Sequence, residues 1–380
     1  MYLHGGDIYR NVGAIDFSAN INFLGMPESV KEAAHKGVEL SVHYPQMQNT
    51  GLTEAIAGYD AENDMMWGMN EQNYVCGNGA AEIIFSFADA LQPKKVFLPA
   101  PTFYEYEQAL TAKVPHCTVQ KYYLSKNNSF DITEDILNQI TEDIELVCVC
   151  NPNNPTGRLI EKSLILQMIA ACKRVGAWFL ADESFMELVK GHESYTICRD
   201  IQSISYDRLL ILKSFTKLFA MPGLRLGYGI SPNKALIQKM KDSLQPWNIS
   251  LPAQCAGIAA ISEIKEHRFD EWSRERIAGE RIFLYNELKK LENTYDCFKV
   301  YEGAANFLLF EVQNEPQAEW LAEKCLEKGM LLRSCSNFDG LGAGWYRTAV
   351  RDRADNEQLV ETLRETLKAL TEPSDIIGQE

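Results

Sequence analysis

One lysine of the chain stands where a surface lysine has little reason to be. Lys217 lies in the segment KSFTKLFAMPGLRLGYGI, after an apolar run and among hydroxyl residues, and a glycine-rich stretch follows it. Most lysines are solvated, and Lys217 taken alone could be an ordinary loop lysine. At the end of a strand, however, a lysine amine can form a Schiff base with an aldehyde cofactor. The residues around it decide between these two interpretations.

Several residues near this lysine are suited to binding a dianionic phosphate. Ser214 and Thr216 carry hydroxyls, and Arg225 offers a planar fork of N–H donors. The turn CGNGAAE precedes a helical pattern, so the backbone N–H groups of Gly79 and Ala80 can bind the same phosphate. The glycines of this turn are a weak signal by themselves, because the full dinucleotide-binding fingerprint is absent.

Two further polar groups follow other buried runs. Asp182 ends the run AWFLAD, where a carboxylate can keep a pyridinium nitrogen protonated so that the ring accepts electrons. On its own it could be the N-cap of a helix. The turn NPNNPTG at 151–157 could likewise be a tight loop of ordinary turn residues. Together, a lysine, a phosphate cradle and a buried acid fit pyridoxal 5'-phosphate (PLP).

An α/β fold would bring these groups together. The runs KKVFLPAP, ELVCVC, AWFLAD and RLLILK are typical of buried strands, and amphipathic stretches such as EKSLILQMIAACKRVGA separate them. This alternation indicates a mostly parallel sheet, whose ligands bind at the carboxyl ends of the strands. Residues 151–157, 182–185 and 214–217 stand at those ends, so we expect them to meet.

The length of 380 residues exceeds what one hydrophobic core usually supports. We predict a large domain over residues 45–265 that binds PLP. A smaller α+β domain would combine residues 1–44 with residues 266–380. A long amphipathic helix over 268–295 would connect the two.

Composition argues against several classes of protein. The net charge of −15 disfavours nucleic-acid and anionic-membrane partners, which bind through excess Lys and Arg. No apolar run approaches about 18 residues, and the first 25 residues lack the pattern of a signal peptide, so we expect no membrane span. Ten cysteines are scattered without a C-x-x-C pair, as in a reducing cytoplasm. No histidine falls at a ligand spacing, so no metal is expected.

The motifs NPNNPTG, ADESF and SFTKLFAMPGLRLGYGI resemble those of the fold-type I aminotransferase superfamily, over essentially the whole chain. The resemblance implies that PLP is the cofactor, that Lys217 binds it covalently and that Asp182 pairs with its ring nitrogen. Phe103 would stack on the ring, although it could equally be a core aromatic. The other implied cofactor contacts come from Gly79, Ala80, Asn154, Ser214, Thr216 and Arg225.

Tyr44, in the segment HYPQ, resembles the tyrosine that reaches the cofactor phosphate of the partner subunit in this superfamily. This resemblance implies a homodimer. Tyr44 could equally be a local packing residue.

Within the superfamily the chain resembles the threonine-phosphate decarboxylases of cobalamin biosynthesis. The segments HGGDIYR, DFSANINFLGMP, QPWNIS and LLRSCSNFDGL carry this resemblance. The related histidinol-phosphate aminotransferases have D-E-A-Y where this chain has DESF, so one hydroxyl near the cofactor is missing. The difference favours decarboxylation of L-threonine O-3-phosphate. A histidinol-phosphate type aminotransferase and a serine-phosphate decarboxylase remain alternatives.

The same resemblance assigns substrate contacts. Arg347 in WYRTAVR matches the carboxylate-binding arginine of the superfamily, and Arg333 in LLRSC would bind the substrate phosphate. His4 and Gly5 would fold over that phosphate, and Asn306 would neighbour the carboxylate. Each arginine could instead form a surface ion pair, and N-terminal segments are often simply mobile. Two arginines in a chain of charge −15 nevertheless suit a small phosphorylated amino-acid substrate.

Overall fold

The computed structural model describes residues 4–62, 69–313 and 315–371. Its largest element is a seven-stranded sheet with the strand order β2-β8-β7-β6-β5-β3-β4. Neighbouring strands are parallel except at β8, which is antiparallel to β2 and β7. The predicted α/β fold with a mostly parallel sheet is therefore confirmed. The strands are β2 (Tyr74–Asn78), β3 (Lys95–Ala100), β4 (Thr118–Tyr123), β5 (Leu146–Cys150), β6 (Trp178–Asp182), β7 (Leu209–Ser214) and β8 (Leu226–Ile230).

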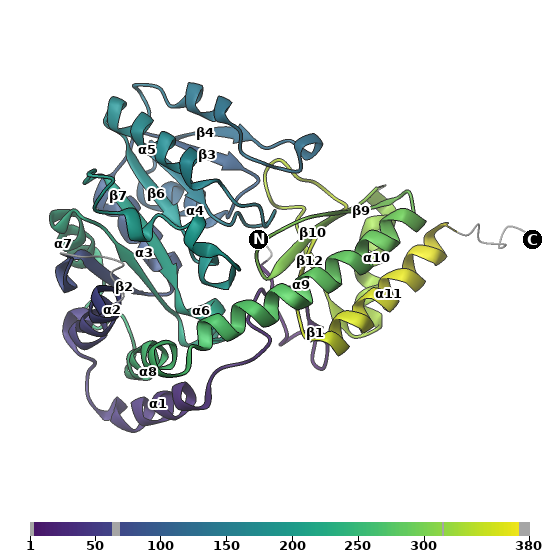
Figure 1. The fold of residues 1–380 in the computed structure, drawn as a ribbon, viewed down its shortest axis with the longest axis horizontal. Coiled ribbons are helices and arrows are strands. Elements are labelled where there is room, and N and C mark those ends of the chain that lie inside the picture. Colours follow the sequence, from purple (N-terminus) through teal and green to yellow (C-terminus); the bar gives the residue numbers. More distant parts are fainter. Residues whose placement is uncertain (1–3, 63–68, 314, 372–380) are drawn as a thin grey trace, which may run out of the picture.

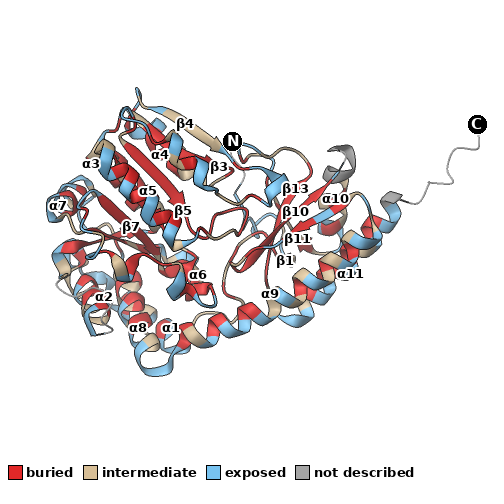
Figure 2. Cartoon of the chain, turned by 45° about the horizontal axis from the view of Figure 1, so that its top comes forward, coloured by how far each residue is buried: buried red, intermediate tan, exposed pale blue. Residues whose placement is uncertain are grey.

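Helices cover both faces of this sheet, which explains why its central strands, such as β5 and β6, are nearly continuous apolar runs. Every residue of β5, with the sequence LVCVC, is buried. Val147 and Val149 belong to one core, whereas Cys148 and Cys150 belong to the other. Figure 2 shows β5 and β7 in the colour of buried residues. The first core contains α2 (Thr50–Glu62), α5 (Lys162–Val175) and α8 (Leu251–His267), and the second contains α3 (Ala80–Leu91), α4 (Glu105–Lys113) and α7 (Lys234–Ser243).

A second, antiparallel sheet lies in the C-terminal third of the chain, with the strand order β12-β13-β10-β9. Its strands are β9 (Phe298–Tyr301), β10 (Phe307–Val312), β12 (Arg333–Ser334) and β13 (Trp345–Ala349). β1 (Ile15–Asp16) pairs in parallel with β11 (Met330–Leu331), so the N-terminal segment joins this part of the fold. The helices beside it are α9 (Phe269–Thr294), α10 (Glu315–Glu327) and α11 (Arg353–Thr371).

Figure 1 shows α9 running from the seven-stranded sheet to the four-stranded sheet, as the predicted connecting helix should. Helix α1 (Glu28–Glu39) packs against α8, so closely that a Cβ on Gly37 would lie 2.5 Å from Pro252. Residues 28–39 therefore contact the part of the fold that is built around the seven-stranded sheet. The exact division of the chain into domains stays a prediction.

A buried ion network lies beside β7, the strand that directly precedes the segment of Lys217. Lys213 of β7 lies 2.8 Å from carboxylate oxygens of both Glu183 and Glu187. Glu183 also accepts hydrogen bonds from the hydroxyl of Thr196 (2.6 Å) and the backbone N–H of Ile197 (2.8 Å). Burial acts to lower the pKa of Lys213, and the two carboxylates reverse this, so that it lies well above its ordinary value. The network pins the ends of β6 and β7 together.

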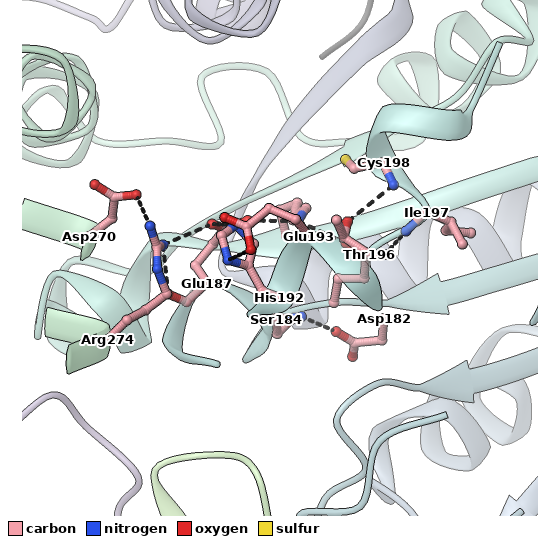
Figure 3. Close-up of polar contacts among 12 residues, drawn as sticks. Asp182, Ser184, Glu187, His192, Glu193, Thr196, Ile197, Cys198, Asp270 and Arg274 are labelled. Atoms are coloured by element: carbon pink, nitrogen blue, oxygen red, sulfur yellow. Dashed lines mark hydrogen bonds and ion pairs between the residues drawn. The ribbon is translucent and has the colours of Figure 1, made fainter. Parts of the chain in front are cut away.

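The network continues away from the sheet (Figure 3). Glu187 lies 3.8 Å from His192 and 3.8 Å from Arg274, and Arg274 pairs with Asp270 at 2.7 Å. Burial acts to raise the pKa of Glu187, but Lys213 and His192 lower it to about 2. The buried charges are therefore matched by opposite charges, as burial requires.

Replacing Lys213 with Met should lower the free energy of unfolding by about 3 kcal/mol, because it leaves the carboxylate of Glu183 buried without its cation. Urea unfolding followed by tryptophan fluorescence measures the change. The control is Lys190→Met, which removes an exposed pair with Glu275 (2.9 Å) and should cost less than about 1 kcal/mol. Equal losses in the two variants would contradict a structural role for the network.

Candidate active site

A pocket of about 630 Å³ opens where the carboxyl ends of the parallel strands face the four-stranded sheet. Its volume is in the range of small-molecule sites. It brings together most of the residues that the sequence predicted. These are His4, Gly5, Ala80, Phe103, Asn154, Asp182, Ser214, Thr216, Lys217, Arg225, Arg333 and Arg347.

Three predicted residues do not line this pocket. Gly79 lies directly behind it, next to Arg225. Asn306 is fully buried, and its side-chain oxygen and nitrogen find no hydrogen-bond partner within the described residues. Tyr44 is 78% exposed and stacks on Trp247 with ring centroids 4.5 Å apart. In the single chain, Tyr44 packs against Trp247, and its ring is largely exposed to solvent.

Lys217 lies on the short helix α6 (Phe215–Leu218), directly after β7. Ser214 caps this helix by accepting a hydrogen bond from the N–H of Thr216, and the two hydroxyls lie 2.8 Å apart. Burial, with help from Arg347 and Arg225, lowers the pKa of Lys217 to about 8. Its amine lies 5.5 Å from the ring centroid of Phe185. A lysine with this pKa is substantially neutral near pH 8 and is therefore nucleophilic.

Asp182 is the last residue of β6 and is buried beside this lysine. One carboxylate oxygen accepts a hydrogen bond from the N–H of Ser184 (2.9 Å), and the other accepts one from the hydroxyl of Tyr106 (2.5 Å). Burial raises its pKa despite these hydrogen bonds. Because burial disfavours the charged form of Asp182, a cation beside it would stabilise the carboxylate. A protonated pyridine nitrogen would be such a cation.

A cradle of backbone N–H groups beside Arg225 lies at the N-terminus of α3. Gly79 has a φ of +86°, and a Cβ there would lie 2.4 Å from the guanidinium of Arg225. On β8, a Cβ at Gly227 would lie 2.6 Å from the backbone nitrogen of Ala80. Both positions therefore require glycine. The first N–H groups of the helix, the hydroxyl of Thr216 and Arg225 form a site whose donors and positive charge fit a phosphate group.

Arg333 and Arg347 occupy directly opposed positions on β12 and β13. Arg347 donates to the carbonyl of Ser18 (2.9 Å) and to the side-chain oxygen of Asn154, and its Nε has no partner within the described residues. Arg333 donates to the side-chain oxygen of Asn337 at 2.9 Å. Burial lowers the pKa of Arg347 to about 10, and the neighbouring Arg333 acts in the same direction. Two opposed guanidinium groups repel each other unless anions lie beside them.

The N-terminal glycines hold their segment against the pocket. A Cβ on Gly5 would lie 2.3 Å from the carbonyl oxygen of Ser18, and the N–H of Gly6 donates to the hydroxyl of Ser18 at 2.7 Å. Only glycine permits this approach at position 5. His4 is thereby placed at the pocket, with its Nδ1 3.5 Å from a carboxylate oxygen of Glu105.

Tyr106, Glu105 and Ser18 belong to the site but were missed in the sequence analysis. Tyr106 stands three residues after Phe103, and its ring packs edge-on against that of Phe103. The closeness of these two aromatic residues in the sequence was the signal that could have found Tyr106. No pattern in the sequence singles out Glu105 or Ser18.

The described residues give no indication of a membrane-spanning helix, because none of their helices is both long and apolar enough. Among the same residues there is no group of three or more His, Cys, Asp or Glu side chains that could hold a metal ion.

Comparison with known proteins agrees with the site. Residues 12–363 match the family described as aminotransferase class I and II. The threonine-phosphate decarboxylase of Salmonella typhimurium is 33% identical, and the match covers 98% of each chain. The histidinol-phosphate aminotransferase of Methanococcus aeolicus is 30% identical, over 92% of this chain and 89% of that one.

Among solved structures, the histidinol-phosphate aminotransferase of Clostridium acetobutylicum superposes with a TM-score of 0.82 at 30% identity. The match covers 93% of this chain and 99% of that one. The family predicted from the sequence motifs is thus confirmed. The chain belongs to the class I and II aminotransferase family, whose enzymes depend on PLP.

Proposed function

We propose that this enzyme decarboxylates L-threonine O-3-phosphate, giving CO₂ and (R)-1-amino-2-propanol O-2-phosphate for cobalamin biosynthesis. The full-length similarity to the Salmonella typhimurium threonine-phosphate decarboxylase supports this activity. The position of the N-terminal HGG segment at the pocket supports it as well, because that segment was part of the sequence resemblance.

The observation that carries the proposal is the opposition of Arg333 and Arg347 across β12 and β13. A substrate with a carboxylate at one end and a phosphate at the other matches both, and each can be held by a bidentate pair of hydrogen bonds. In this assignment Arg347 binds the carboxylate, and Arg333 with His4 binds the phosphate.

The cofactor would be held by Lys217, by the cradle at α3 and by Asp182, with Asn154 at its phenolic oxygen and Phe103 on its ring. When bound, PLP withdraws the electron pair that a breaking bond leaves on the substrate Cα. Asp182 keeps the ring nitrogen protonated and so maintains that capacity. Arg347 would bind the carboxylate, and decarboxylation requires that the C–COO⁻ bond be the one presented for cleavage. Lys217 or a water molecule then supplies the proton that Cα gains as CO₂ leaves.

An aminotransferase of the histidinol-phosphate type is the second candidate, favoured by the similarity to the Methanococcus aeolicus and Clostridium acetobutylicum enzymes. It would cleave the Cα–H bond and would need an oxo acid as second substrate. The phenylalanine at position 185 argues against it, since the ring of Phe185 faces Lys217 without a hydroxyl. A serine-phosphate decarboxylase is a close variant, because one methyl group is worth only about 1–3 kcal/mol of discrimination.

We also propose that the enzyme is a cytoplasmic homodimer. Cytoplasmic location rests on the cysteines, all of which are free in the described structure. Homodimerisation rests on the surface around Tyr44, where Val42 is 82% and Met47 58% exposed. An apolar surface of this kind is typical of an interface.

The pH dependence of cofactor attachment should report on Lys217. Because only the neutral amine is nucleophilic, the rate at which the apoenzyme gains the visible absorption of bound PLP should rise with pH and level off above about pH 8. Lys217→Ala should show no such absorption at any pH, whereas Lys190→Ala, at an exposed site, should behave as wild type. Retention of the absorption in Lys217→Ala would refute the assignment.

Incubation of the PLP-loaded enzyme with L-threonine O-3-phosphate, without any oxo acid, should release CO₂ continuously. Repeating the assay with L-serine O-phosphate measures how much the methyl group of the substrate contributes to the rate of CO₂ release. Absence of CO₂, together with conversion of the cofactor to its pyridoxamine form by histidinol phosphate, would identify a transaminase instead.

Mixed dimers should reveal whether Tyr44 acts across an interface. Tyr44→Phe should weaken PLP binding about tenfold by removing one hydrogen bond to a charged group. Mixing Tyr44→Phe with Lys217→Ala subunits creates sites that combine Lys217 with the partner subunit's Tyr44. Activity at limiting PLP should therefore exceed the sum of the separate variants. No gain after subunit exchange would mean that Tyr44 does not act in trans.

A further inference from the structure

Glu105 is a pocket carboxylate to which the proposed function assigns no task. Among the described residues, Asp16, Glu105 and Asp182 are the carboxylates that line the pocket. Asp16 and Asp182 each accept hydrogen bonds from N–H and O–H donors. Glu105 differs from both. One of its oxygens lies 3.5 Å from Nδ1 of His4, and the other is buried without a partner in the described part of the chain.

The surroundings of this pair favour uncharged forms when no ligand is present. Burial raises the pKa of Glu105 to about 7, with Asp182 acting in the same direction and Lys217 and Arg333 against it. Burial and the charge of Arg333 lower the pKa of His4. Near pH 7 a substantial fraction of the pair is therefore a neutral acid beside a neutral imidazole.

We propose that Glu105 is a positioning residue that orients His4 and passes it a proton when a phosphate group enters the pocket. The O–H bond of Glu105 breaks, an N–H bond forms at Nδ1, and the neutral pair becomes a carboxylate and an imidazolium. No other reactant is needed. This inference rests on the phosphorylated substrate class of the proposed function and concerns how the phosphate end is bound.

The geometry suits this exchange. With Nδ1 facing Glu105 at 3.5 Å, the Nε2–H of His4 is the group that can donate to an anion. A carboxylate behind a histidine fixes its tautomer and raises its basicity, as in metal sites. Without the histidine, Glu105 would repel a phosphate. Gly5 and Gly6, packed against Ser18, hold His4 in this position.

Isothermal titration calorimetry of the PLP-loaded enzyme tests the proposal. The probe is 3-phosphoglycerate, which carries a carboxylate and a phosphate but has no amino group and so cannot react with the cofactor. Measuring the binding enthalpy at pH 7 in buffers of different ionisation enthalpy gives the number of protons taken from solvent. Wild type should take up only about half a proton, because Glu105, with a pKa of about 7, supplies the rest.

Glu105→Gln cannot supply that proton. It should therefore draw nearly one proton per ligand from the buffer and bind 3-phosphoglycerate roughly tenfold more weakly. The matched control is Glu107→Gln on the same helix, whose carboxylate pairs with Lys121 at 2.8 Å outside the pocket; it should match wild type. D-glycerate, which lacks the phosphate, should bind wild type and Glu105→Gln equally.

His4→Gln provides a second variant at a half-exposed position near the N-terminus, where folding is not at risk. It should lose at least as much affinity as Glu105→Gln, since the carboxylate of Glu105 then repels the phosphate. Adding Glu105→Gln to it should cost nothing further, because the two residues act as one unit. Additive losses, unchanged affinity of Glu105→Gln, or uptake of a full proton by wild type would each overturn the proposal. Since the probe does not react, these results stand apart from whether the enzyme releases CO₂.

Discussion

Four cations converge on one pocket, and their mutual repulsion is the constraint on which the site depends. Lys217 and Arg225 come from the seven-stranded sheet, and Arg333 and Arg347 come from the four-stranded sheet. Away from bulk water such repulsion is weakly screened. It contributes to the lowered pKa values of Lys217 and Arg347, and it makes the pocket selective for anions. The net charge of −15 gives no hint of this local excess.

Two lysines four residues apart show how strongly surroundings decide chemistry. Lys213 and Lys217 are both buried, and burial alone lowers the pKa of either amine. Lys213 meets two carboxylates on one side of the sheet, so it stays charged and serves structure. Lys217 lies in the pocket near Arg347 and Arg225, so it loses its proton near pH 8 and becomes available for covalent chemistry.

The site also ties distant parts of the chain together. Arg347 of β13 donates to Ser18 in the N-terminal segment and to Asn154 in the loop after β5. A single side chain thus links the four-stranded sheet, the N-terminal segment and the edge of the large sheet. Occupation of the pocket by anions would relieve the repulsion between Arg333 and Arg347. Binding of an anionic ligand should therefore stabilise the placement of these three segments relative to one another.

Local sequence was sufficient for the fold class and for the core of the cofactor site. Buried strands read as apolar runs, and the groups after each run, including Asp182 and Lys217, share one edge because parallel strands end together. The glycine at position 79 was predictable because a close backbone turn admits no side chain. The family motifs then supplied the identity of the cofactor. These features depend on neighbours within a few residues, which is why the sequence determined them.

Other features depended on contacts between segments far apart in the chain. The family resemblance assigned Arg333 and Arg347 to one substrate, but only the register of β12 against β13 set them directly opposite each other. Glu105 looks like an ordinary first-turn acid of a helix, and its raised pKa arises from burial by distant segments. Tyr44 and Asn306 lie away from the pocket for the same reason. Burial and register are properties of the packed chain, so tertiary structure alone decided them.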